Sequence, residues 1–207
     1  MKRTIVVAVA LAFVLLSAGA ALAGISGSKH DMRSWLTDET LGYNEVCVYC
    51  HTPHSASTSA QLWNRTNVVV SSYQVYTSST MNAVPGLPGA GSQLCLSCHD
   101  GTIAVNDLVN APNTGAASDF FITNPNALMG TDLTNDHPIG LNYVTSKAGE
   151  PLGLVATLDV VNGGTVRLIG GTQVECASCH DAHNAVVEPF LRSSNVGSLL
   201  CTACHNK

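Results

Sequence analysis

All eight cysteines of the chain lie in four copies of one short motif, CxxCH. In chain order these are CVYCH (47–51), CLSCH (95–99), CASCH (176–180) and CTACH (201–205), called here motif 1 to motif 4. Two thiols two residues apart on one turn can form thioethers with a porphyrin, and the histidine that follows can bind its iron. We therefore predict four haem c groups, each with a proximal histidine. The attachment residues would be Cys47, Cys50, Cys95, Cys98, Cys176, Cys179, Cys201 and Cys204. The proximal iron ligands would be His51, His99, His180 and His205.

CxxC pairs have roles in proteins other than haem attachment. Such pairs also bind zinc or form redox-active disulfides, and cysteines of exported proteins often form structural disulfides. None of these uses requires a histidine directly after the second cysteine in every copy. Because all four copies carry that histidine and no cysteine is left over, the pattern favours haem.

The four histidines outside the motifs equal the number of sixth iron positions to be filled. They are His30, His54, His137 and His183. His54 and His183 each follow a proximal histidine by three residues, so neither can reach the opposite face of its own porphyrin. We expect each to serve a neighbouring haem, with His183 well placed for the haem of motif 4. The rival sixth ligands are methionines, of which Met32, Met81 and Met129 follow residue 23.

The N-terminus has the layout of a secretory signal peptide. Lys2 and Arg3 precede an apolar segment, and Ala21-Leu22-Ala23 forms a small-x-small cleavage site. An uncleaved membrane anchor is the alternative, because the apolar segment nears spanning length. We expect residues 1–23 to be removed and the rest exported to the cell exterior or cell surface, with the periplasm as the alternative destination.

The composition predicts little regular secondary structure and a fold whose core is supplied by its cofactor. The formal net charge is −5, with no basic patch, which argues against a nucleic-acid partner. The predicted fold class is a multihaem cytochrome c, mostly coil with short helices and a few short β-strands or hairpins, whose core is four stacked, covalently bound haems. Helices are expected at the attachment turns and near 38–47, a strand within 67–79, and a hairpin over 153–171. Asn64-Arg65-Thr66 also matches a glycosylation sequon.

The organisation expected is a single haem-cored unit with a soft internal boundary. Residues 24–110 would carry the haems of motifs 1 and 2. Residues 111–207 would carry the hairpin and the haems of motifs 3 and 4.

Beyond the motifs themselves, the order of SKHDMR, CVYCHTPH, CLSCHDGT, DHPIG and CASCHDAH resembles the tetrahaem c-type cytochromes of the extracellular cytochrome filament (OmcE-like) family. The resemblance implies a mostly coil fold with a continuous row of bis-histidine haems. It also implies that an adjacent subunit donates one axial histidine. The position of His30 near the expected mature N-terminus suggests this residue for that intermolecular role.

The function expected is electron conduction by a protein that is not an enzyme. Expected partners are further copies of this chain in a head-to-tail polymer, upstream periplasmic or outer-membrane cytochromes, and extracellular electron acceptors. Two alternatives stay open. One is a soluble periplasmic tetrahaem shuttle, and the other is a multihaem oxidoreductase with one open haem.

Overall fold

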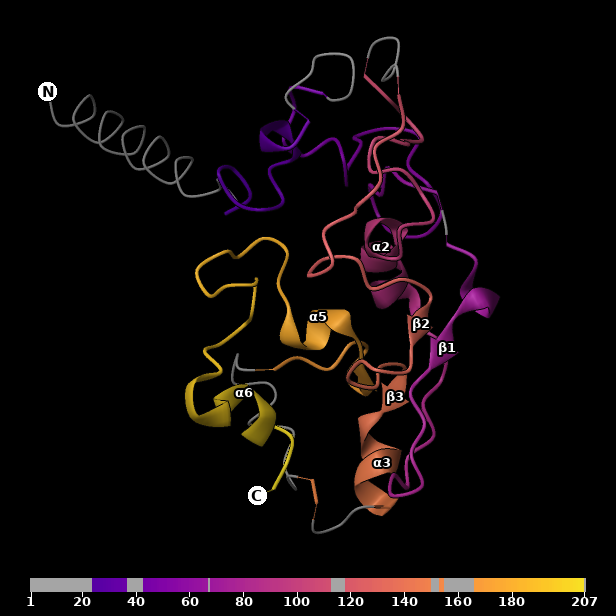
Figure 1. Cartoon of the computed structure of the whole chain (residues 1–207), viewed down its shortest axis with the longest axis vertical. Helices are drawn as coiled ribbons and strands as arrows, with labels where there is room; N and C mark the ends of the chain where they lie inside the picture. The colour runs from indigo at the N-terminus through magenta and orange to yellow at the C-terminus, as the bar shows by residue number, and fades with distance from the viewer. Residues whose placement is uncertain are drawn as a thin grey trace, which may run out of the picture.

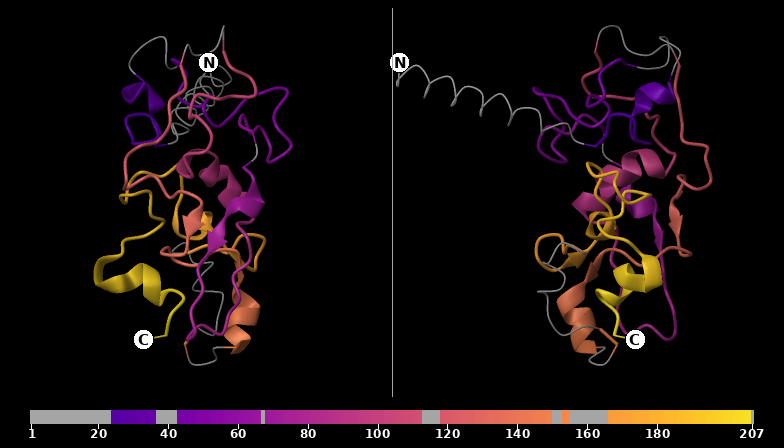
Figure 2. Two further views of the ribbon diagram at one scale, coloured as in Figure 1. Left: turned by 45° about the vertical axis from the view of Figure 1, so that its right-hand side comes forward. Right: turned by 90° about the vertical axis from the view of Figure 1, so that its left-hand side faces the viewer.

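The computed structural model describes residues 24–36, 43–66, 68–112, 118–149, 153–154 and 166–206. The described chain is mostly turns and coil and forms an elongated molecule (Figure 1). The segment after residue 24 lies at one end of the long axis, and α3 and α6 lie toward the other (Figure 2). The expected signal peptide, residues 1–23, lies outside the described residues. No helix in the described ranges is long and apolar enough to cross a membrane.

The regular elements are short, as the composition predicts. The α-helices are α2 (Ala90–His99), α3 (Tyr143–Gly149), α5 (Cys176–Cys179) and α6 (Leu199–Thr202). The 3-10 helices are η1 (Met32–Ser34), η2 (Val70–Ser72) and η4 (Val196–Ser198). The strands are β1 (Gln74–Val75), β2 (Asp132–Leu133), β3 (Leu141–Asn142) and β4 (Gln173–Val174). The multihaem class prediction of coil with short helices and small strands is therefore confirmed at this level.

The strands form two minimal sheets. β1 pairs with β2 in parallel, and β3 pairs with β4 antiparallel. β1 precedes residue 110 and β2 follows it, so hydrogen bonding crosses the boundary expected there. The strand expected within 67–79 is confirmed only at Gln74–Val75, whereas Val70–Ser72 forms a 3-10 turn. Residues 38–42 of the predicted helix at 38–47 and residues 155–165 of the predicted hairpin lie outside the described residues. The described part of that helix, residues 43–47, forms bends and a turn instead.

Among the described residues, three small hydrophobic clusters take the place of one continuous core. The first contains Leu36, Tyr43, Tyr49 and Val105. The second contains Val68, Tyr73, Leu96 and Leu133. The third contains Tyr143, Val166, Leu168 and Ala203. Each cluster includes a residue from inside an attachment motif, namely Tyr49, Leu96 or Ala203, so the apolar packing is organised around the motifs.

Candidate haem-binding sites

Each attachment motif folds into one helical turn. Motif 2 ends α2, the longest of the described helices, and motif 3 coincides with α5. Motif 4 begins within α6 and continues past its end at Thr202. Motif 1 is a hydrogen-bonded turn in which the His51 amide donates to the Cys47 carbonyl at 2.8 Å. The corresponding bonds are 3.0 Å in motif 3 and 2.9 Å in motif 4. One turn brings the two cysteines and the histidine to one side, the arrangement that attachment to a single porphyrin needs.

The third residue of every motif points into the protein. These residues are Tyr49, Ser97, Ser178 and Ala203, with exposed fractions of 2%, 1%, 0% and 4%. The cysteines are less buried, and Cys47 and Cys201 are exposed. The motifs are therefore oriented with their third residues inward and their attachment atoms toward the space beside the chain.

Three of the four proximal histidines face one of the remaining histidines across a similar distance. Ring centroids are 6.0 Å apart for His51 and His183, 6.1 Å for His30 and His99, and 6.3 Å for His137 and His205. A metal ion between two imidazoles, with metal–nitrogen bonds of about 2 Å, requires ring centroids roughly 6 Å apart. All three pairs fit that requirement.

Hydrogen bonds at the second ring nitrogen favour the tautomer that binds metal. His99 Nδ1 lies 2.7 Å from the Ala127 carbonyl oxygen, and His180 Nδ1 lies 3.0 Å from that of Pro189. A carbonyl only accepts, so Nδ1 must carry the proton and donate it. The Nε2 lone pair is then left for a metal, as in histidine ligands generally. His137 makes the same contact with the Pro138 carbonyl at 3.0 Å.

Burial also favours neutral imidazoles at two of the pairs. Burial, assisted by the proximity of His99, lowers the pKa of His30. Burial and the nearby His183 lower the pKa of His51 in the same way. Because only the neutral form binds iron, the donor set fits haem ligation.

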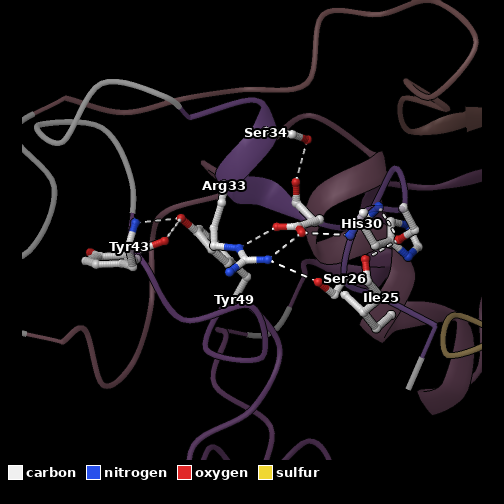
Figure 3. A network of polar contacts seen from close by, with 10 residues as sticks. Ile25, Ser26, His30, Arg33, Ser34, Tyr43 and Tyr49 are labelled. Atoms are coloured by element: carbon white, nitrogen blue, oxygen red, sulfur yellow. Dashed lines mark hydrogen bonds and ion pairs between the residues drawn. The ribbon is translucent and has the colours of Figure 1, made fainter. Parts of the chain in front are cut away.

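A network of polar contacts shapes the N-terminal arm that carries His30 (Figure 3). The buried Asp31 carboxylate accepts hydrogen bonds from Arg33 Nε at 2.8 Å and Nη2 at 2.7 Å, and from the Gly27 amide at 2.9 Å. Arg33 also donates to Ser26 Oγ at 3.3 Å. The His30 ring then stacks on Phe190 with centroids 4.2 Å apart. The arm is thereby folded against the loop around residue 190, with His30 directed to His99.

This pairing differs from two expectations. His183 was expected to serve the haem of motif 4, but its ring partner is His51, and His205 of motif 4 faces His137. His30 was suggested as the intermolecular ligand, but it lies beside His99 of the same chain. Neither difference could be read from spacing along the sequence, because folding brings together residues from distant segments.

His54 and His180 are the remaining two histidines, and both are exposed. Among the described residues neither ring makes a pair like the other three. The His54 carbonyl accepts hydrogen bonds from Thr52 Oγ1 at 3.0 Å and Asn110 Nδ2 at 3.3 Å. His54 therefore extends from a loop whose backbone is held in place.

Consecutive motifs lie next to one another in space. The Cys98 thiol of motif 2 adds to burial in raising the pKa of Cys50 in motif 1 to about 12. A hydrogen bond with Cys176 of motif 3 raises the pKa of Cys95 in motif 2. Burial and the neighbouring Cys179 raise the pKa of Cys204 in motif 4 to about 11. The attachment points thus follow one another in chain order.

Two buried polar connections between the motifs were missed by the sequence analysis. Asn64 Nδ2 donates to the Val48 carbonyl of motif 1 at 2.8 Å, and Arg65 Nη2 donates to the Ser97 carbonyl of motif 2 at 2.7 Å. Glu175, at the start of α5, accepts hydrogen bonds from Ser92 Oγ of α2 and from the Gly89 amide. The sequence signal at Asn64 was a sequon, but this side chain is fully buried and hydrogen-bonded, which does not suit an acceptor of sugar.

Among the described residues no group of three or more histidines, cysteines, aspartates or glutamates is arranged to hold a metal ion. All eight cysteines, which the structure describes, are free of disulfides. Six of the eight histidines instead form the three pairs described above.

Comparison with known proteins adds one finding. The model of the family described as "Doubled CXXCH motif" matches residues 171–207, which contain motifs 3 and 4. No curated protein matches the sequence. Together with the geometry of the motifs, this match gives the chain the signature of a multihaem c-type cytochrome, a haem-binding electron-transfer class whose haem c is covalently attached.

Proposed function

We propose that the protein is an exported tetrahaem cytochrome that conducts electrons through closely spaced bis-histidine haems. The observation that carries the proposal is the set of three histidine pairs with centroids 6.0 to 6.3 Å apart. In this assignment His183 is the distal ligand for motif 1, His30 for motif 2 and His137 for motif 4. Haem c, when bound, supplies an iron that gains and loses one electron.

The role of the polypeptide is to close both faces of each iron and to hold neighbouring sites together. An iron with two histidine ligands offers no position to a substrate, which favours electron transfer over catalysis. The closeness of the Cys95 and Cys176 sulfurs and the packing of α2 on α5 support close approach of the sites of motifs 2 and 3. Electrons would pass along the motifs in chain order.

The fourth pair is completed between molecules in this proposal. His54 of one copy binds the iron held by His180 of the next copy, because both residues are exposed and neither has a ring partner in the described chain. A head-to-tail contact that does not close on itself generates a filament. His54 takes the intermolecular role first suggested for His30. Together with the expected signal peptide, this contact favours an extracellular filament that delivers electrons to external acceptors.

The test is electron microscopy of haem-loaded protein sheared from the outside of cells. We expect regular filaments for the unmodified protein and for His30→Ala, and dispersed monomers with four covalent haems for His54→Ala. Filaments of His54→Ala would contradict the intermolecular ligand. Recovery of the unmodified protein only as periplasmic monomers would favour a soluble tetrahaem shuttle.

A multihaem oxidoreductase is the second candidate, and the exposure of His180 favours it, because this ring has no histidine partner among the described residues. If no second copy supplies His54, the iron bound by exposed His180 keeps an open face. Carbon monoxide separates the two functions, since it binds reduced haem with an open position. One equivalent bound by the assembled protein would favour the oxidoreductase, whereas none bound by filaments and one by the His54→Ala monomer would favour conduction.

A further inference from the structure

The guanidinium of Arg65 is a fully buried charge that binds only neutral groups. Its exposed fraction is 0%. Nε donates to Ser97 Oγ at 3.0 Å and Nη2 to the Ser97 carbonyl at 2.7 Å. Nη1 donates to the Val105 carbonyl at 2.6 Å, and Nη2 also to that of Ala104 at 2.8 Å. The ion pairs between described residues are Lys29–Glu188, Arg33–Asp31 and Arg192–Asp181, and none includes Arg65.

This charge lies between the first two attachment sites. Ser97 stands between the two cysteines of motif 2, so Arg65 touches the interior of that motif directly. The preceding residue, Asn64, binds motif 1. Its backbone amide donates to the Cys50 carbonyl at 2.9 Å, and its side chain donates to the Val48 carbonyl at 2.8 Å. Two consecutive residues therefore fix the charge against both motifs.

A charge of opposite sign is buried at the third site. Glu175 directly precedes Cys176 and is 4% exposed. Both of its carboxylate oxygens accept from the Gly89 amide at 3.2 Å, and one also accepts from Ser92 Oγ. Two accepting oxygens are the pattern of an ionised carboxylate. No described cation forms an ion pair with it.

Charges in a low-dielectric interior act strongly on a neighbouring redox site. Reduction adds one electron to the iron, so a buried cation stabilises the reduced form and a buried anion the oxidised form. We propose that Arg65 raises the reduction potentials of the haems attached at motifs 1 and 2 above that of the haem at motif 3. Electrons then reside preferentially at the N-terminal end of the haem row. This inference rests on the proposed function in that haems occupy the motifs.

The experiment is a spectroelectrochemical titration of haem-loaded protein, with Arg65→Gln and Arg65→Lys as the matched pair. Arg65→Gln removes the charge, and Arg65→Lys keeps it while losing the planar fork. For Arg65→Gln we expect the two highest-potential haems to titrate lower. Their ratio of reduced to oxidised form at a fixed potential should fall about tenfold, equivalent to about 59 mV. Arg65→Lys should stay closer to the unmodified protein, and Glu175→Gln should shift a low-potential haem upward.

Equal shifts for Arg65→Gln and Arg65→Lys, or no shift for Arg65→Gln, would overturn the charge-based explanation. If neither variant acquires its haems, the unmodified protein still tests the inference. The gap between the high- and low-potential haems should persist from low to high salt, because a buried charge is poorly screened. Loss of that gap at high salt would overturn the inference. Haem counting by mass separates the two proposals, because fewer than four haems in the unmodified protein contradicts the proposed function itself.

Discussion

The imidazoles of His51 and His183 lie nearly parallel, at an interplanar angle of 16° and with ring centroids 6.0 Å apart. His51 belongs to the first attachment motif, whereas His183 follows the third. The Gly24 amide also donates to the His183 carbonyl at 2.9 Å. In the proposed assignment the haem site of motif 1 therefore requires the C-terminal part of the chain, and its formation joins the segment after residue 24 to that part.

Loss of His183 should open one haem without loss of covalent attachment. For His183→Ala we expect four haems by mass and one more equivalent of carbon monoxide bound to the reduced protein than in the unmodified protein. The reason is that the cysteines of motif 1 are untouched while its distal ligand is gone. His183→Met is the matched variant, since a thioether can restore six-coordination and raises the potential of that haem. Unchanged carbon monoxide binding by His183→Ala would contradict the assigned pair.

Asn64 should be a determinant of stability. Its side chain binds the Val48 carbonyl, and also the Asn110 carbonyl at 3.1 Å and amide at 2.8 Å. Asn64→Ala leaves these buried groups unpaired, so the free energy of unfolding should fall by at least about 2 kcal/mol. Denaturant titration of the haem-loaded protein measures this change. The control is Asn126→Ala at an exposed position, for which a change within about 0.5 kcal/mol is expected.

Asp31 should hold the N-terminal arm in its folded form. Asp31→Asn removes the charged partner of Arg33, so trypsin should cleave after Arg33 several-fold faster than in the unmodified protein. Glu188→Gln is the control, because it breaks only the exposed Lys29–Glu188 ion pair of 2.9 Å. Exposed pairs contribute little to stability. Equal cleavage rates for Asp31→Asn and the unmodified protein would show that the carboxylate does not hold the arm.

Haem should be required for cooperative folding. The three hydrophobic clusters are small and separate, and much of the described backbone lies outside helices and strands. Protein produced without haem attachment should therefore show no cooperative thermal transition by circular dichroism, as for small domains that fold only with their metal. A sharp transition in haem-free protein would mean that the polypeptide has a sufficient core of its own.

The sequence was most informative where the chemistry is local. Five adjacent residues define each attachment site, so motifs 1 to 4 and their helical turns could be recognised from spacing. The partner of His51 could not be recognised in this way, because tertiary packing brings His183 to it from a distant part of the sequence. Arg65 carried no signal, since nothing in WNRT distinguishes a buried arginine from an exposed one. The strand expected within 67–79 forms only at Gln74–Val75, because Val70, a β-branched residue typical of strands, instead begins a 3-10 turn.

The inward third residue of every motif limits how far these sites can be exchanged. That position holds tyrosine, serine, serine and alanine at Tyr49, Ser97, Ser178 and Ala203, all buried, so only motifs 2 and 3 share a residue there. Machinery that attaches haem needs the cysteines and the histidine, which are common to all four. The fold needs the buried residue between them, which differs in every motif except the pair formed by motifs 2 and 3. Replacing motif 1 or motif 4 with another motif would preserve the chemistry of attachment and still put a residue of the wrong size or polarity in the buried position. In the proposed row of haems, a new site therefore cannot be added by copying five residues alone.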